Sequence, residues 1–96
     1  MNVVVTGASG VLGGGVVKRL KDIHNVCATD VIAGEGIESA DLCKIDQVQK
    51  IVDGADVVIH CAAIHPWKQY TPDQYLDNNV KACHHVFSAC VKAGVK

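Results

Sequence analysis

The chain has 96 residues, which is enough for one small domain and too few to include a separate substrate-binding domain. Nine Lys and Arg residues against ten Asp and Glu residues give a formal net charge of −1, and no basic stretch occurs, so we expect no nucleic-acid partner. The apolar runs fall well short of the ~18 residues of a membrane span, and the N-terminus lacks a signal-peptide pattern, so no membrane partner is expected.

The five cysteines form no Cys-x-x-Cys pair, and each lies within an apolar stretch. This usage is typical of buried, reduced thiols rather than of a disulfide framework. We therefore expect a cytoplasmic protein.

Short runs rich in β-branched residues predict three strands, at residues 2–6, 25–29 and 56–61. Their hydrophobicity is continuous rather than alternating, which is typical of parallel strands that helices cover on both faces. A shorter and more polar run at 37–40 predicts a fourth strand at an edge of the sheet.

Two helical patterns lie between these runs. Leu12, Val16 and Leu20 repeat at intervals of four and predict a helix after the first strand. A second apolar pattern predicts a shorter helix that begins with Asp46 as its N-cap and stops at Gly54.

The segment 71–74 predicts the start of a third helix, because it supplies an N-cap threonine, a first-turn proline and a capping-box glutamine. Gly94 is expected to end this helix. A helical wheel sorts its apolar residues into two stripes: Leu76, Val80, Cys83, Phe87 and Cys90 on one, and the smaller Ala82, Val86, Ala89 and Ala93 on the other. We expect the stripe of small residues, the open edge of the sheet, or both to mediate self-association as a homo-oligomer.

The order of these elements predicts an α/β fold over residues 1–96, a doubly wound parallel sheet with the strand order 3-2-1-4. Such sheets bind ligands beyond the carboxyl ends of their strands, where the strand order reverses. Here the reversal lies between the first and fourth strands, and the turn after the first strand lies at that point.

The turn after the first strand reads T-G-x-x-G-x-x-G, with Gly7, Gly10 and Gly13 spaced by three. Such a turn exposes backbone N–H groups at the positive end of the helix dipole, and the missing side chains let a pyrophosphate approach them. The alternative is a tight turn with close packing of the helix on the strand. Gly14 and Gly15 predict a first helical turn that is frayed, ordered by a ligand or packed very closely on the sheet.

Asp30 ends the second strand, about 20 residues after Gly10, where a carboxylate can accept both hydroxyls of an adenosine ribose. Its negative charge would repel a 2′-phosphate, which favours NAD over NADP. The alternative is an aspartate that only caps a turn.

These motifs resemble the extended short-chain dehydrogenase/reductase family, the NAD-dependent epimerase/dehydratase group, whose N-terminal half is part of a Rossmann fold. The resemblance rests on the glycine motif, Asp30, Asp41-Leu42, Val58–Ala63 and Asn79-Val80. It implies that Gly7, Gly10 and Gly13 hold the pyrophosphate of NAD and that Asp30 binds the adenosine ribose. Asp41 and Leu42 would contact the adenine edge, and Ala62 and Ala63 would lie beside the second ribose. The further cofactor-site residues expected are Ser9, Val11, Leu12, Cys61 and Asn79.

Asn79 falls between the two apolar stripes of the third helix, so we expect its amide to be buried and hydrogen-bonded. In the family the matching asparagine is tied to the backbone near the active site. A plain structural asparagine is an equal alternative.

The catalytic groups of the family have no match in this chain. The family places a serine or threonine after the next strand, and later a tyrosine with a lysine four residues on, whereas Gln74 follows Tyr70 and Asn79 follows Tyr75 at that spacing. We therefore predict no catalytic residue here. At most, His65-Pro66-Trp67 forms one wall of a substrate site.

The histidines suggest a metal site, but no His or Cys pair has a recognised zinc spacing, so no metal is expected. His60 is expected to end a buried strand with its ring hydrogen-bonded.

We therefore expect an NAD-binding module, either a truncated form or one piece of a larger enzyme. The intact parent would transfer a hydride between nicotinamide and a substrate such as a nucleotide sugar. A non-catalytic dinucleotide-sensing or protein-interaction module is the alternative.

Overall fold

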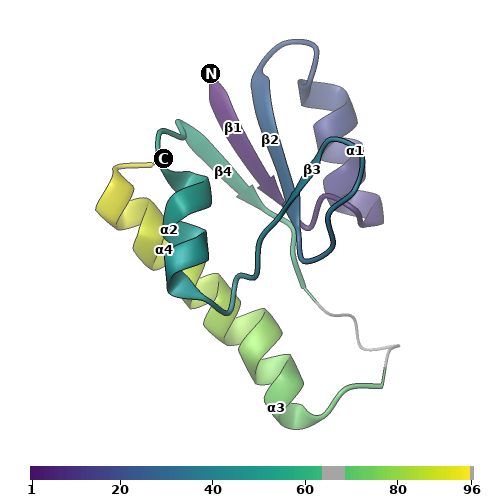
Figure 1. Ribbon diagram of the computed structural model, residues 1–96, viewed down its shortest axis with the longest axis vertical. Helices are drawn as coiled ribbons and strands as arrows, with labels where there is room; N and C mark the ends of the chain where they lie inside the picture. Colours follow the sequence, from purple (N-terminus) through teal and green to yellow (C-terminus); the bar gives the residue numbers. More distant parts are fainter. Residues whose placement is uncertain (64–68, 96) are drawn as a thin grey trace.

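The computed structural model describes residues 1–63 and 69–95. In them, a single parallel sheet lies between helices (Figure 1). The elements in chain order are β1 (Asn2–Thr6), α1 (Val11–Leu20), β2 (Asn25–Asp30), β3 (Ile37–Ser39), α2 (Ile45–Val52), β4 (Val57–His60), α3 (Pro72–Tyr75), the π-helical segment η1 (Leu76–Lys81) and α4 (Ala82–Ala93). The predicted wall formed by His65, Pro66 and Trp67 lies outside the described residues.

The strand order is β3-β2-β1-β4 and all three pairings are parallel, which confirms the predicted doubly wound α/β topology. The register places Thr6 of β1 between Thr29 of β2 and His60 of β4. Because parallel strands point the same way, the turns that follow these three residues meet at one edge of the sheet.

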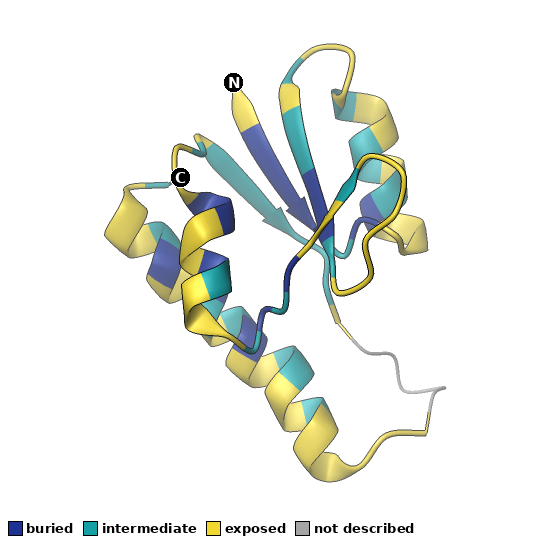
Figure 2. Cartoon of the chain, viewed as in Figure 1, coloured by how far each residue is buried: buried dark blue, intermediate teal, exposed yellow. Residues whose placement is uncertain are grey.

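Helix α1 covers one face of the sheet, while α2 and α4 pack together over the other (Figure 1). Side chains alternate along β1, so Val4 faces the α2–α4 side and the buried Val3 and Val5 face the other. The main core lies on the α2–α4 side, and Figure 2 shows the buried segments of these two helices in dark blue. It consists of Val4, Ala40, Leu42, Val48, Ile51, Val52, Ala82, Val86 and Ala89.

Helix α1 is regular from Val11, where the Gly14 N–H donates to the Gly10 carbonyl at 2.9 Å, so the expectation of a frayed first turn is wrong. A Cβ on Gly14 would lie 3.2 Å from the Ala8 carbonyl oxygen, whereas one on Gly15 would meet open space. Close packing therefore explains Gly14 and not Gly15. The predicted apolar stripe of α1 is also poorly covered, since Leu12 is 70% exposed.

The predicted start of α2 is wrong. Its N-cap is Lys44, which provides no side-chain cap, and Asp46 lies inside the first turn. The side chain that fixes this region is Gln47, whose Oε1 accepts the Asp41 N–H at 2.8 Å. The predicted end is confirmed, because Gly54 follows the helix with a positive φ of 77°.

The capping box at the start of α3 is confirmed. The Gln74 N–H donates to Thr71 Oγ1 at 3.2 Å, and the Thr71 N–H donates to Gln74 Oε1 at 2.8 Å. Gly94 adopts the left-handed conformation that ends α4, as predicted. The sequence pattern did not reveal the intervening π-helical segment, whose wider turn changes which residues share a face.

The last helix buries, within the same chain, the stripe of small residues that was predicted to mediate self-association. Ala82, Val86 and Ala89 pack into the core, so the predicted contact between copies through this stripe is wrong. The side chains left at the surface are the larger ones of the other stripe, with Phe87 67% exposed. Of the residues described, none lies in a helix long and apolar enough to cross a membrane.

Candidate functional site

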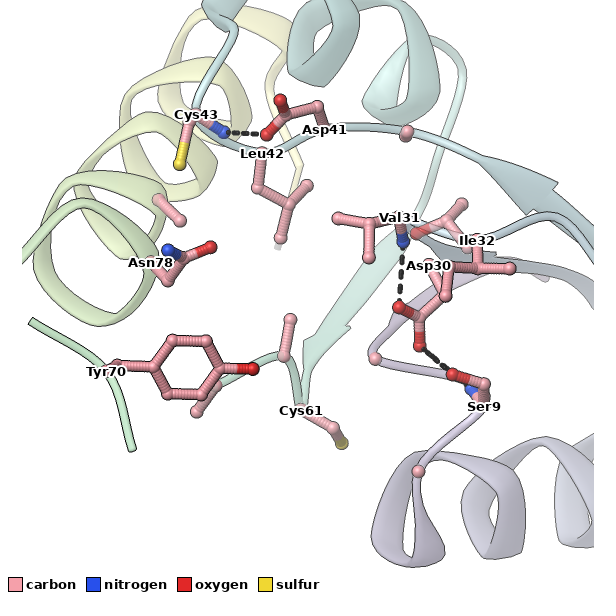
Figure 3. A pocket seen from close by; sticks show the side chains of 17 residues that line it. Ser9, Asp30, Val31, Ile32, Asp41, Leu42, Cys43, Cys61, Tyr70 and Asn78 are labelled. Atoms are coloured by element: carbon pink, nitrogen blue, oxygen red, sulfur yellow. Dashed lines mark hydrogen bonds between the residues drawn. The ribbon is translucent and has the colours of Figure 1, made fainter. Parts of the chain in front are cut away.

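A cleft of about 410 Å³ opens at the carboxyl ends of the strands (Figure 3). It lies where the strand order reverses, between the turn after β1 and the segments that follow β2, β3 and β4. The hydroxyl end of Tyr70 points into it from the side opposite Asp30 (Figure 3). The lining residues are Gly7, Ser9, Gly10, Thr29, Asp30, Val31, Ile32, Ala40, Asp41, Leu42, Cys43, Cys61, Ala62, Ala63, Tyr70, Asn78 and Ala82.

The glycine turn brings β1, α1 and the end of β4 together. Gly7 has a φ of 67°, and a Cβ there would lie 2.7 Å from the Ala62 nitrogen. A Cβ on Gly13 would collide with the backbone of Gly7. These two glycines are therefore required by the backbone packing itself.

Gly10 differs from its two neighbours in the motif. It is the N-cap of α1 with an ordinary φ of −79°, and a Cβ there would approach only the Gly7 carbonyl oxygen, at 3.3 Å. No side chain caps this helix. The first-turn N–H groups of α1 therefore point, with the positive end of the helix dipole, toward the space beside Gly10, an arrangement that suits an anion.

A second hollow, of about 1040 Å³, runs along the exposed side of α1. Val11, Leu12 and Gly13 line this groove rather than the cleft, and Val11 is 99% exposed. The cleft and the groove share three lining residues, Gly7, Gly10 and Cys61. The glycine turn is thus the junction between the two hollows.

Asp30 presents its carboxylate to the cleft from the end of β2. Its Oδ1 accepts the Val31 N–H at 2.7 Å, and its Oδ2 accepts the Ser9 N–H at 3.0 Å and the Ser9 hydroxyl (Figure 3). The carboxylate therefore links the end of β2 to the glycine turn. Asp30 combines the turn-capping role that the sequence left open with a position on the cleft wall.

The segment after β3 forms the wall of the cleft that carries Asp41 and Leu42. Asp41 Oδ1 accepts the Cys43 N–H at 2.9 Å and closes a local turn. The ring of His85, on α4, donates from Nδ1 to the Leu42 carbonyl at 2.8 Å. The Cys43 thiol donates to the Asp77 carbonyl at 3.3 Å. Contacts from α4 and η1 thus hold this wall in place.

Thr6 fixes the backbone at the end of β4. Its Oγ1 accepts the N–H groups of Cys61 and Ala62 at 3.1 and 3.2 Å and lies 2.7 Å from Nδ1 of His60. With both acceptor positions filled, the hydroxyl proton is donated to Nδ1, so the neutral ring carries its proton on Nε2. Burial lowers the pKa of His60 below its ordinary value, which agrees with this neutral form. The predicted hydrogen-bonded ring of His60 is confirmed.

The Cys43 thiol, on the wall of the cleft, is in its neutral form. Burial raises the pKa of Cys43, with smaller contributions from Asp41 and Asp77. All five cysteines carry free thiols. Within residues 1–63 and 69–95, no group of three His, Cys, Asp or Glu side chains is placed to hold a metal ion.

The cleft gathers nine of the residues predicted for the cofactor site: Gly7, Ser9, Gly10, Asp30, Asp41, Leu42, Cys61, Ala62 and Ala63. Val11, Leu12 and Gly13 lie in the groove, and Asn79 lines neither hollow. Asn79 is partly buried rather than fully buried as predicted. The asparagine that lines the cleft is Asn78, on the π-helical segment. No pattern in the sequence indicates Asn78, whereas Val31 and Ile32 can be identified because they follow Asp30 directly.

Two viral proteins illustrate the relatives of this chain. It is 33% identical to the uncharacterized protein 052L of Frog virus 3, an alignment that covers 97% of this chain and 30% of the relative. It is 28% identical to the 3 beta-hydroxysteroid dehydrogenase/Delta 5-->4-isomerase of Monkeypox virus, which covers 96% of this chain and 31% of the relative. The chain thus spans about a third of the length of these relatives.

A solved structure with a similar fold is MoeE5 in complex with UDP-glucose and NAD. It superimposes with a TM-score of 0.84 at 31% identity, over 99% of this chain and 34% of that protein. The family model for the NAD dependent epimerase/dehydratase family matches residues 3–96. The chain therefore belongs to the NAD dependent epimerase/dehydratase family, within the extended short-chain dehydrogenases/reductases.

Proposed function

We propose that this chain binds NAD, with the adenosine half in the cleft and the pyrophosphate at the glycine turn. The observation that carries the proposal is the pairing of Asp30 with the uncapped start of α1 across one cleft. A carboxylate accepts hydroxyl groups, and free helix N–H groups bind phosphates, so one ligand with both features satisfies both sides. The NAD complex of MoeE5 supports the same cofactor here.

The geometry also suggests a course for the rest of the dinucleotide. The cleft and the groove meet at Gly7, Gly10 and Cys61, so a ligand whose phosphates lie at Gly10 can continue past the end of β4. We place the second ribose beside Ala62 and Ala63, which line the cleft at that end. Thr6 contributes indirectly, because its hydroxyl holds the Ala62 N–H.

The proposed preference is for NAD over NADP. Asp30 stands at the adenosine end of the cleft with three donors on its carboxylate, all of them uncharged groups. The Asp41 carboxylate lies on the neighbouring wall. A 2′-phosphate would place its negative charge against these carboxylates without a cation among the residues that line the cleft.

For a longer protein that contains this chain, we propose hydride transfer between the nicotinamide and a nucleotide sugar. When bound, NAD supplies the hydride acceptor. The UDP-glucose complex of MoeE5, at 31% identity, supports this substrate class over the steroid named for the Monkeypox virus relative, at 28% identity. The chain itself has no Tyr-x-x-x-Lys sequence, so we expect binding by these 96 residues without turnover.

We also propose self-association through the sheet rather than through the last helix. In the described part of the chain, β4 pairs with β1 alone, which leaves the other edge of β4 for a strand of another copy. The five free thiols support a reducing compartment such as the cytoplasm.

The experiment is calorimetric titration of the chain with NAD, compared between the unmodified protein and Gly10→Val. The extra side chain should fill the phosphate position and abolish binding, while the N-cap conformation at φ −79° tolerates it. Gly34→Val is the matched control, because a Cβ there meets only the Ile37 side chain, at 3.7 Å. Binding that persists in Gly10→Val, or no binding by the unmodified chain, contradicts the proposal.

A further inference from the structure

The carboxylate proposed to receive the ribose already has partners in the free protein. Oδ2 of Asp30 accepts two hydrogen bonds, both from Ser9, one from its N–H at 3.0 Å and one from its hydroxyl. Oδ1 accepts one, from the Val31 N–H at 2.7 Å. Figure 3 shows the side chains of Asp30 and Ser9 facing each other at the mouth of the cleft.

A carboxylate offers about four acceptor positions, two on each oxygen. In Asp30, three are filled, so Oδ2 is saturated and Oδ1 has one position left. The two neighbouring hydroxyls of a ribose require two positions, preferably one on each oxygen. One of the three internal donors must therefore leave before both hydroxyls can bind.

The Ser9 hydroxyl is the donor that can leave. The N–H groups of Ser9 and Val31 belong to the backbone of the glycine turn and of the strand end, so moving them would disturb the fold around β1 and β2. The Ser9 side chain is exposed, and a rotation about a single bond carries its hydroxyl into water. This rotation frees the second position on Oδ2 without any change in the backbone.

We propose that the Ser9 hydroxyl is an internal competitor for the ribose-binding oxygen of Asp30, and so sets the affinity of the site for ligands that carry a cis-diol. This inference rests on the proposed function, because it takes the adenosine ribose as the ligand of Asp30. Ser9 is then a positioning residue that holds the carboxylate in the empty site and must be displaced when the ligand enters. Its removal strengthens binding, in contrast to the loss expected for most residues that line a site.

The test compares the unmodified chain with Ser9→Ala in calorimetric titrations with NAD, ADP and 2′,3′-dideoxy-ADP. Because a hydrogen bond contributes about 0.5–1.5 kcal/mol net, Ser9→Ala should bind NAD and ADP about 2- to 10-fold more tightly. The dideoxy compound keeps the adenine and both phosphates but has no diol, so its affinity should not change. Ser9→Thr retains the hydroxyl and should match the unmodified chain, and Ser88→Ala, an exposed position on α4, is the control for a serine elsewhere.

A second measurement needs no nucleotide. In the ligand-free chain, Asp30→Asn should shift the backbone amide resonances of both Ser9 and Val31, because the carboxylate that accepts their protons is replaced. Unshifted resonances overturn the inference. The inference is also overturned if Ser9→Ala binds NAD no more tightly than the unmodified chain, or if its affinity for the dideoxy compound rises as much as its affinity for ADP. In each of these cases the proposed function stands. If neither form binds NAD or ADP, the proposed function fails, and the inference fails with it.

Discussion

Replacing Asp30 with alanine tests the site at its most polar point. The change removes the two carboxylate oxygens proposed to accept the ribose hydroxyls. The same oxygens accept three internal hydrogen bonds, from the Ser9 N–H, the Ser9 hydroxyl and the Val31 N–H. Because these donors are near the surface, water replaces the lost partner and the fold is retained. Hydrogen bonds to a charged group contribute about 1.5–3 kcal/mol, so the affinity for NAD should fall about 10- to 150-fold.

The same variant should lose its discrimination between cofactors. NADP should bind poorly to the unmodified chain, because its 2′-phosphate would meet the Asp30 carboxylate, and alanine would remove that repulsion. Calorimetric titration with NAD and NADP measures both affinities. Asp53→Ala is the matched control, because it removes a carboxylate at the other end of the sheet. Asp53 precedes Gly54, whose carbonyl accepts a hydrogen bond from the Asn2 side chain at the start of β1. Equal affinity of the unmodified chain for NAD and NADP would refute the assignment of Asp30 to the ribose.

Two further predictions concern stability. Gly13→Ala should lower the free energy of unfolding by about 1–3 kcal/mol, because the new methyl group overlaps the Gly7 backbone. Gly15→Ala, in open space on the same helix, should raise it by up to about 1 kcal/mol. Urea denaturation measures both, and an equal effect of the two changes would be evidence against the packing argument. Burial lowers the pKa of His60, so its unfolded form binds a proton more readily than its folded form, and the chain should lose stability as the pH falls below about 6.5. The midpoint of urea unfolding should depend less on pH in His60→Gln over this acidic range than in the exposed control His84→Gln, and parallel curves for the two variants would show that His60 does not contribute.

The sheet was predictable because the strands are both apolar and separated by clear breaks. The predicted bounds of the first strand equal the observed ones, and those of the second differ by one residue. The order 3-2-1-4 follows once right-handed crossovers are assumed. The turns after these strands must then meet at one edge. Most of the cleft was found in this way, because Gly7, Asp30 and Ala62 each follow a predicted strand.

The errors lie where neighbouring elements, rather than local sequence, decide the outcome. Asp46 is a good N-cap residue, but Gln47 reaches back to Asp41 and the helix begins earlier, at Ile45. The helical wheel assumed α-helical spacing throughout, and the π-helical segment places Asn78 on the cleft and leaves Asn79 beside it. Neither a long-range side-chain contact nor an extra residue in a helical turn has a signature in the pattern of apolar residues.

The prediction about the last helix failed for a related reason. The helix has two apolar faces, and the face of small residues was predicted to contact another copy of the chain. Helix α2 packs close to α4, and the small side chains of Ala82, Val86 and Ala89 allow that close approach. The bulkier Phe87 stays exposed. The requirement for small residues was correctly recognised, but the partner is a helix of the same chain.

The glycine motif has two explanations, and the structure assigns them to different residues. Gly7 is needed for its φ of 67° and for its approach to Ala62, and Gly13 is needed because any side chain would strike Gly7. Both would be glycine in a protein that binds nothing. Gly10 has an ordinary φ of −79° and only one moderately close neighbour, so the fold alone does not demand it. It stands at the junction of the cleft and the groove, before the uncapped start of α1, and is therefore the glycine that carries the evidence for a phosphate.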